Sequence, residues 1–149
     1  MELPFNTVTS SPNETERVGG EIARALLEEP SLPRFIAMFG DLGVGKTAFT
    51  RGFTREISPS AKVKSPTFAL VNEYPSPTLP VYHFDMYRIT SEDDLFSIGF
   101  DDYIESRGVC VVEWSENILF ALPESYIKVT IEKTGEDTPD QRRLSVELI

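Results

Sequence analysis

The residues with the clearest chemistry lie in one glycine-rich segment, GDLGVGKT, at positions 40–47. Its glycines, lysine and threonine match the pattern G-x-x-x-x-G-K-[ST] at every position. Such glycines let backbone N–H groups turn toward phosphate oxygens, the lysine adds positive charge for the β and γ phosphates, and the threonine hydroxyl is a ligand for Mg²⁺. The segment therefore predicts a nucleoside triphosphate site with contacts from Asp41, Leu42, Gly43, Val44, Gly45, Lys46 and Thr47.

The segments on either side of this motif have the patterns that such a site requires. RFIAMFG, residues 34–40, is a short apolar run that ends in glycine, which is typical of a buried parallel strand. In KTAFTRGFTREI, Phe49, Phe53 and Ile57 recur every four residues and predict a helix. A helix that begins here directs its positive end toward bound phosphate.

Two acidic residues compete for the second Mg²⁺ ligand. Asp85 follows VYHF and Glu113 follows VCVV, so both lie at the ends of expected strands, where ligands bind in open α/β sheets. The strand before Glu113 is wholly apolar and should lie nearer the centre of the sheet. We prefer Glu113 for this reason, and a role as a solvated strand-end acid stays open for either residue.

Four further residues have two interpretations each. Thr67, in KSPTF, stands where GTPase-like proteins sense the γ-phosphate, although a threonine before a strand is also ordinary. Arg88 has the chemistry of an internal arginine finger, but a structural ion pair is the more usual role. Trp114 could stack on a partner or a loop, or fill the edge of the core. His83 is the only histidine, and such a residue is more often structural than a proton carrier.

The remaining patterns predict the fold. SPNETERVGGEIARALLEEP is typical of a helix, with Ser11 as N-cap and Glu14 completing a capping box. Residues 67–74 and 80–89 read as a hairpin, SEDDLFSIGFDDYI as a helix and 108–114 as a buried strand, while YIKVTIEK and RRLSVELI alternate as antiparallel strands do. We expect a single P-loop NTPase domain over residues 1–149, of the α/β class, with three layers and a mainly parallel central sheet that ends in antiparallel C-terminal strands.

The overall composition excludes several classes of function. With 14 Lys and Arg against 24 Asp and Glu, the net charge is −10, which disfavours a wide nucleic-acid interface and leaves room for a basic protein partner. No apolar run approaches the length of a membrane span, and the first residues do not resemble a signal peptide. There is one cysteine, Cys110, so no disulfide framework is expected. These features together predict a cytoplasmic protein.

Five segments, in this order and spacing, resemble the bacterial TsaE (YjeE) family: GDLGVGKTAFTRGF, KSPTFALVNEY, YHFDMYRI, LFSIGFDDYI and VCVVEWSE. The resemblance covers roughly residues 34–123. It implies the P-loop ATPase of tRNA threonylcarbamoyladenosine biosynthesis, with ATP as substrate and Mg²⁺ as cofactor. It also implies slow hydrolysis by the chain alone and association with TsaD and TsaB type proteins, which carry out the tRNA modification and would be reset after each round. Contact with tRNA would then be indirect.

The resemblance carries the functional residues of the family onto single positions of this chain. The P-loop lysine and threonine, the Mg²⁺-binding glutamate, the important aspartate, the switch threonine and the tryptophan fall on Lys46, Thr47, Glu113, Asp85, Thr67 and Trp114. Lys46, Asp85 and Thr67 are the expected catalytic residues. Arg88 matches the last position of the family string H-x-D-x-Y-R, and the resemblance assigns it no role.

Two other functions compete with this interpretation. A small-molecule kinase would need an acceptor pocket and usually an arginine-rich lid, whereas the longest insert, PSPTLP, is short and uncharged. A binding module could hold ATP as a ligand without turnover. No motif identifies the base pocket, and we expect its walls around residues 10–12 or in the C-terminal strands.

Overall fold

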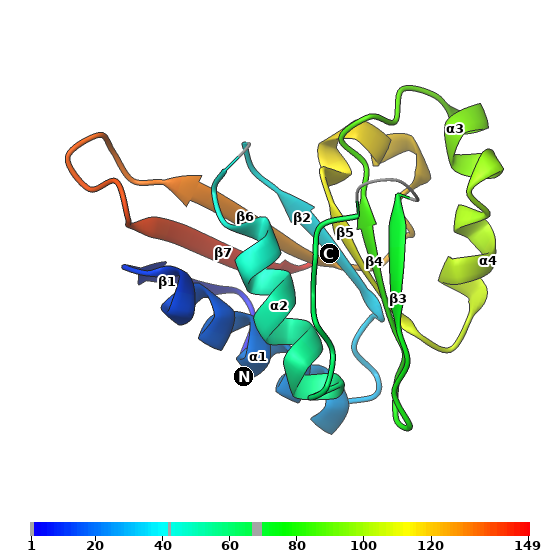
Figure 1. Ribbon diagram of the computed structural model, residues 1–149, viewed down its shortest axis with the longest axis horizontal. Coiled ribbons are helices and arrows are strands. Elements are labelled where there is room, and N and C mark those ends of the chain that lie inside the picture. Colours follow the sequence, from blue (N-terminus) through cyan, green and yellow to red (C-terminus); the bar gives the residue numbers. More distant parts are fainter. Residues whose placement is uncertain (1, 42, 67–69) are drawn as a thin grey trace.

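The computed structural model describes residues 2–41, 43–66 and 70–149. Its described strands form one mixed sheet in the order β1-β7-β6-β2-β5-β4-β3 (Figure 1). The four central strands, β6, β2, β5 and β4, are parallel, and the other three pair antiparallel at the two edges. The predicted α/β class, with a mainly parallel centre and antiparallel C-terminal strands, is confirmed. The strands are β1 (Phe5–Thr9), β2 (Phe35–Phe39), β3 (Val71–Tyr74), β4 (Val81–Asp85), β5 (Val109–Glu113), β6 (Ile127–Lys133) and β7 (Arg142–Leu148).

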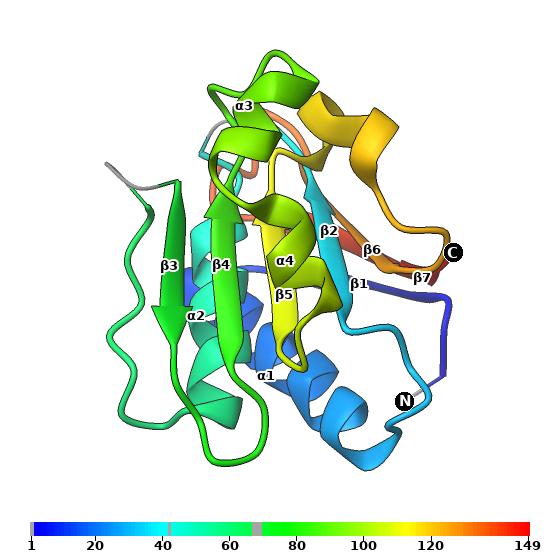
Figure 2. The same cartoon turned by 90° about the vertical axis from the view of Figure 1, so that its right-hand side faces the viewer.

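Helices cover both faces of this sheet, so the molecule has three layers. Helices α1 (Pro12–Glu28) and α2 (Lys46–Ile57) pack on one face, and α3 (Glu92–Ser97), α4 (Phe100–Glu105) and the 3₁₀ segment η1 (Ser115–Ala121) pack on the other. Figure 2 shows α4 in front of the sheet, with α1 and α2 behind it. Successive residues of β2 alternate between the two cores, with Ile36 and Met38 on the α1 and α2 side. This double burial explains why β2 is apolar throughout.

The start of α1 largely follows its sequence signal. Ser11 is the N-cap, and its hydroxyl oxygen accepts a hydrogen bond from the Glu14 amide at 3.2 Å. The Glu14 carboxylate returns to the amide of Ser10 at 2.5 Å, one residue earlier than a standard capping box. Pro12 occupies the first helical position, as predicted.

Glycines allow α1 and α2 to approach each other closely. A Cβ added to Gly19 would lie 2.2 Å from the carbonyl oxygen of Phe49, and one added to Gly52 would lie 1.8 Å from that of Glu16. Neither position accepts a side chain without a backbone shift. This crossing sets the position of α2, whose first residue is Lys46.

The structure corrects four sequence expectations. The helix predicted from SEDDLFSIGFDDYI is two helices, because Gly99 interrupts it with a φ of +72°. The predicted strand 67–74 begins at Val71, after Leu70 with a φ of +57°, and its first residues lie outside the described part. The predicted strand 80–89 ends at Asp85, and neither β1 nor η1 was expected. No helix among the described residues is long and apolar enough to cross a membrane.

The helix crossing makes Gly52→Ala strongly destabilising. The added methyl group would collide with backbone, and overpacking of this kind costs about 1–3 kcal/mol or more. Gly20→Ala is the matched control, because its methyl group would have only ordinary contacts at 3.6 Å, so alanine should leave stability unchanged or raise it by up to about 1 kcal/mol. Urea unfolding of both variants measures the difference, and equal stabilities would contradict the close approach.

Candidate functional site

The glycine-rich loop, residues 40–47, connects the end of β2 to the start of α2. Gly40 and Gly45 have φ values of +145° and +108°, in the region that favours glycine. Gly40 also has no room for a side chain, since a Cβ would lie 2.4 Å from the carbonyl oxygen of Ile131. No side chain caps α2 at Gly45, so the first amides of this helix are available to an anion. Leu42, predicted as a contact, lies outside the described residues.

The two competing carboxylates end neighbouring strands. Strands β4 and β5 pair in parallel with Asp85 directly opposite Glu113. Strand β5 lies next to β2, so the strand of Glu113 is the more central one, as its apolar sequence predicted. Both acids therefore lie at the same end of the sheet as the glycine-rich loop.

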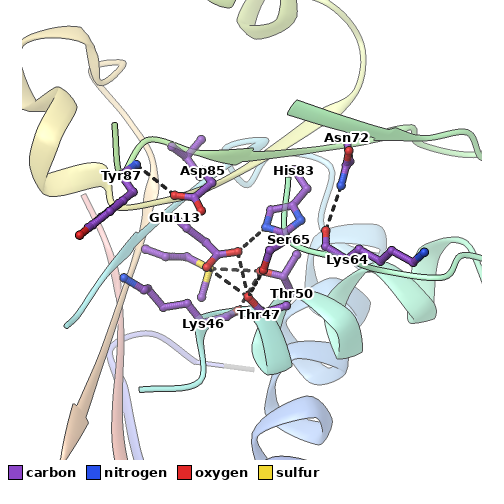
Figure 3. Close-up of polar contacts among 12 residues, drawn as sticks. Lys46, Thr47, Thr50, Lys64, Ser65, Asn72, His83, Asp85, Tyr87 and Glu113 are labelled. Carbon is purple, nitrogen blue, oxygen red and sulfur yellow. Dashed lines mark hydrogen bonds and ion pairs between the residues drawn. The ribbon is translucent and has the colours of Figure 1, made fainter. Parts of the chain in front are cut away.

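Thr47 and Glu113 meet at the start of α2. The Thr47 hydroxyl lies 3.4 Å from each carboxylate oxygen of Glu113 and 3.0 Å from the Ser65 hydroxyl. Fully buried His83 forms a hydrogen bond through Nε2 with the Glu113 carboxylate. Figure 3 shows these side chains converging from α2, β4, β5 and the segment before β3. His83 thus holds a carboxylate in place, in agreement with its structural interpretation.

Lys46 is buried, with 4% of its surface exposed. Its ammonium group donates to the carbonyl oxygen of Gly40 at 2.6 Å and lies 3.7 Å from the centre of a Trp114 ring. Its side chain runs away from Thr47 (Figure 3). Burial lowers the pKa of Lys46, and the surrounding acids, Glu116 foremost, oppose this shift. The lysine is therefore a desolvated cation surrounded by carboxylates, available to an anion that enters the loop.

Asp85 differs electrostatically from an ordinary surface aspartate. Burial raises its pKa, and the nearby Glu113 carboxylate acts in the same direction. The Tyr87 amide donates to Oδ1 of Asp85 at 3.0 Å and partly opposes the shift. A cation placed between the two carboxylates would remove their repulsion.

A hollow of about 530 Å³ lies beside the glycine-rich loop, and we call it the side hollow. Its walls come from the ends of β2 and β6, the loop and η1, namely Phe39, Gly40, Asp41, Val44, Glu116, Thr130, Ile131, Glu132 and Lys133. The end of β6 supplies one wall of the side hollow, and residues 10–12 do not line it. Glu116 accepts a hydrogen bond from the Gly40 amide at 3.1 Å, and its buried Oε1 has no hydrogen-bond partner among the described residues.

Arg142, at the start of β7, holds the outer side of the glycine-rich loop. Its Nε donates to the carbonyl oxygen of Val44 at 2.8 Å, and its Nη2 lies 3.4 Å from that of Gly43. Its Nη1 donates to the carbonyl oxygens of Pro139 and Gln141 at 2.7 and 2.8 Å. In a trans peptide the C=O and N–H groups point in opposite directions. Because Arg142 holds the carbonyl groups of Gly43 and Val44 on the outer side, the amide N–H groups of Val44 and Gly45 point to the inner side of the loop.

The contacts described above do not include two of the predicted residues. Thr67 lies outside the described residues, and Arg88 is an exposed residue beyond the end of β4. Trp114 belongs to the site, beneath Lys46 and 5.0 Å from the ring of Tyr87. Cys110 is buried, and burial raises the pKa of its thiol to about 12, which agrees with a structural role.

Sequence reasoning missed Ser65, Glu116 and Arg142. Ser65 had a weak signal, because it lies in the same KSPTF segment as Thr67. Arg142 is separated from Val44 by 98 residues along the chain, and no local pattern connects them. Glu116 had a similarly weak signal, as one acid in the VCVVEWSE segment.

The oxygen atoms at this site suit Mg²⁺ only in part. Thr47 and Glu113 offer a hydroxyl and a carboxylate, which are ligands of the kind that Mg²⁺ prefers. In the described ranges, no group of three His, Cys, Asp or Glu residues could hold a metal by itself. The residues present therefore fit an ion that shares its coordination with phosphate and water rather than one held in a protein cage.

The sheet order and the glycine-rich loop between β2 and α2 define an α/β protein of the P-loop type. Residues 9–144 match the family model described as "Threonylcarbamoyl adenosine biosynthesis protein TsaE". The chain belongs to this family, and the predicted resemblance is confirmed.

Individual relatives agree with this assignment. The chain is 36% identical over 136 residues to the tRNA threonylcarbamoyladenosine biosynthesis protein TsaE of Bacillus subtilis, covering 91% of this chain and 81% of the relative. It is 39% identical over 117 residues to the protein of the same name from Haemophilus influenzae, covering 78% and 74%. A crystal structure of Bacillus subtilis YdiB superposes with a TM-score of 0.74 at 30% identity, covering 98% of this chain and 86% of that one.

Replacing Arg142 should weaken nucleotide binding without unfolding the protein. Arg142→Ala releases the carbonyls of Gly43 and Val44, and we expect the dissociation constant for ADP with Mg²⁺ to rise about tenfold, equivalent to about 1.4 kcal/mol. Arg143→Ala is the control, because Arg143 is the next strand residue and is exposed. Calorimetry measures binding and thermal unfolding measures stability. An unchanged dissociation constant in the Arg142 variant would refute its positioning role.

Asp85→Asn should stabilise the nucleotide-free protein at neutral pH in the presence of a metal chelator. The pKa of Asp85 is higher in the folded state than in the unfolded state. The carboxyl group therefore contributes favourably to the free energy of unfolding at low pH, and this contribution is lost as pH rises through the folded pKa. Asparagine has no such loss and can still accept from the Tyr87 amide. The advantage of the variant should thus grow from about pH 4 to pH 7 in urea unfolding. A constant difference across this range would contradict the raised pKa.

Proposed function

We propose that this chain is a Mg²⁺-dependent ATP hydrolase that supports threonylcarbamoyladenosine modification of tRNA by binding and resetting a TsaB–TsaD type transferase pair. The observation that carries the catalytic part is that the Thr47 hydroxyl meets the Glu113 carboxylate at the end of the glycine-rich loop, whose Gly40 carbonyl oxygen accepts from the buried Lys46 ammonium group. Membership of the TsaE family and the names of the relatives support the pathway.

The loop and Lys46 would bind the phosphates. Amides of the loop and the uncapped start of α2 donate to phosphate oxygens, and Arg142 keeps the loop in the conformation that allows this. Lys46 would exchange its hydrogen bond to Gly40 for contacts with the β and γ phosphates. Their negative charge would compensate the ammonium group for the hydration that it loses by burial.

Thr47 and Glu113 would hold Mg²⁺, which when bound neutralises charge on the β and γ phosphate oxygens. His83 fixes the orientation of the Glu113 carboxylate from behind, as outer-shell partners do. Asp85, which lies opposite Glu113 in the sheet, would orient the attacking water or a water on the ion. Thr67 stays a candidate for sensing the γ-phosphate.

The nucleoside would occupy the side hollow. A volume of about 530 Å³ lies within the range of small-molecule sites, and the hollow begins at Gly40 on the β6 side of the loop. Adenine rather than guanine follows from the family resemblance. Glu116 lines this hollow, and its carboxylate would be an acceptor for a hydroxyl or amino group of the nucleoside.

Turnover by the chain alone should be slow, because the described residues gathered around Thr47 include no arginine finger. Arg88 is exposed beyond the end of β4. A partner would then complete the site or be remodelled through it. A non-hydrolysing ATP switch would bind ATP equally well and release no phosphate. A kinase would transfer phosphate to an acceptor other than water. Phosphate release with and without the transferase pair separates these alternatives.

Glu113→Gln tests the metal role and Lys46→Ala the phosphate role. We expect Glu113→Gln to lower Mg²⁺-dependent phosphate release by about 10²–10³-fold while ATP still binds, since the ion that stabilises charge in the transition state loses one charged ligand. Lys46→Ala should lose ATP binding and tRNA modification together. Binding is followed by calorimetry, and modification by mass spectrometry of digested tRNA.

Cys110→Ala serves as the unrelated control, because this buried thiol touches no part of the proposed chemistry. Wild-type turnover in Glu113→Gln would refute the metal role of this residue. If Lys46→Ala binds no ATP yet fully supports modification, the ATP-dependent function itself is wrong.

A further inference from the structure

A hollow lined by both aromatic and acidic side chains lies on the opposite side of the sheet from α1 and α2, between α3 and η1. Phe96 and Phe120 line it with 85% and 53% of their surfaces exposed, and its volume is about 390 Å³. The buried side chains of Leu95 and Phe100 also line it. We call this feature the α3–η1 hollow. Two exposed phenylalanines beside a surface hollow are typical of an interaction site.

The rim of the α3–η1 hollow is acidic. Glu92, Asp93 and Asp101 line it, and its lining residues include no lysine or arginine. The exposed side chains of Asp93 and Asp101 make no hydrogen bond or ion pair within the described ranges. An occupant that matches this surface would carry an apolar side chain next to Lys or Arg.

The α3–η1 hollow is connected to the candidate nucleotide site through η1. This segment starts directly after Trp114, which lies beneath Lys46. Near its start, Glu116 binds the Gly40 amide, and near its end Phe120 lines the hollow. Asn117 between them donates to the carbonyl oxygens of Met86 and Tyr87, just beyond β4. A partner in the hollow would therefore touch an element that also contacts the glycine-rich loop.

We propose that the α3–η1 hollow is the docking surface for a segment of the partner protein that presents an apolar side chain flanked by basic residues. The inference rests on the proposed function, in which the partner is the transferase pair. A second copy of this chain is a poorer occupant, because it would bring another acidic rim and a net charge of −10 to the same surface. The same charge disfavours anionic lipid and nucleic acid.

The first test removes the apolar contacts. A variant with Phe96→Ser and Phe120→Ser should bind the transferase pair at least about tenfold more weakly, since exposed aromatic anchors commonly dominate such interfaces. Its dissociation constant for ADP, its turnover without the pair and its thermal unfolding should stay at the values of the parent. Leu27→Ser on α1 is the matched control, with a leucine that is 39% exposed on the other side of the sheet.

The second test removes the charge. Asp101→Lys should slow association with the pair, most clearly at low salt, and Asp101→Asn should do so by a smaller factor. Glu28→Lys, an exposed reversal at the end of α1, changes the net charge equally and should leave the rate unchanged. Surface plasmon resonance at two salt concentrations measures both rates, and Asp101→Asn keeps the test valid if the lysine variant unfolds.

The outcomes separate the docking surface from the proposed function. If the parent binds the pair and the double serine variant binds equally well, the docking surface is wrong and the proposed function stands. If the parent fails to bind the pair both in the presence of ATP and in the presence of ADP, the proposed function is wrong and this inference is lost with it. If sedimentation shows a parent dimer that the serine substitutions convert to monomer, the occupant is a second copy and the proposal is overturned.

Discussion

The parallel pairing of β2 with β5, and of β5 with β4, is the constraint on which the rest of the site depends. Parallel strands end on the same side of a sheet, so this pairing places the glycine-rich loop, Glu113 and Asp85 together although 66 residues separate Thr47 from Glu113. A shift of β4 by one residue would turn Asp85 to the opposite face and leave Glu113 without its neighbour. The buried pairing of His83 with Glu113 adds a side-chain contact between the same two strands.

Helix packing completes what the strands begin. The crossing of α1 and α2 at glycines fixes the position of α2, and with it Lys46 and Thr47 relative to Glu113. The result is one buried ammonium group among several carboxylates, with an uncapped helix start beside it. Such an arrangement is costly when empty, because burial disfavours the charge of Lys46 and the ionised form of Asp85. Phosphate with a divalent cation would supply the missing opposite charges to both residues at once.

The parts of the fold that could be predicted from sequence are those whose causes are local. Helix α2 has the predicted bounds because its apolar spacing and the preceding glycines agree, and the strand of Glu113 was placed centrally from its unbroken apolar run. The missed parts depend on single backbone conformations or on distant contacts. Gly99 breaks a helix that its neighbours favour, and β1 pairs with β7 from the other end of the chain. Arg142 likewise reaches Val44 across 98 residues, which no periodicity reveals.

The same distinction applies within the candidate site. Lys46, Thr47 and the two strand-end acids belong to a pattern of residue types, so their convergence was predictable, whereas the contacts that orient them were not. Glu116 of η1 contacts the glycine-rich loop, and Trp114, directly before η1, lies beneath Lys46. The segment then continues to Phe120 on the surface. A ligand that draws Lys46 from Trp114 and competes with Glu116 for the Gly40 amide acts on both attachments of η1. The segment η1 and its attachments are therefore a physical route from the glycine-rich loop to the exposed side chain of Phe120.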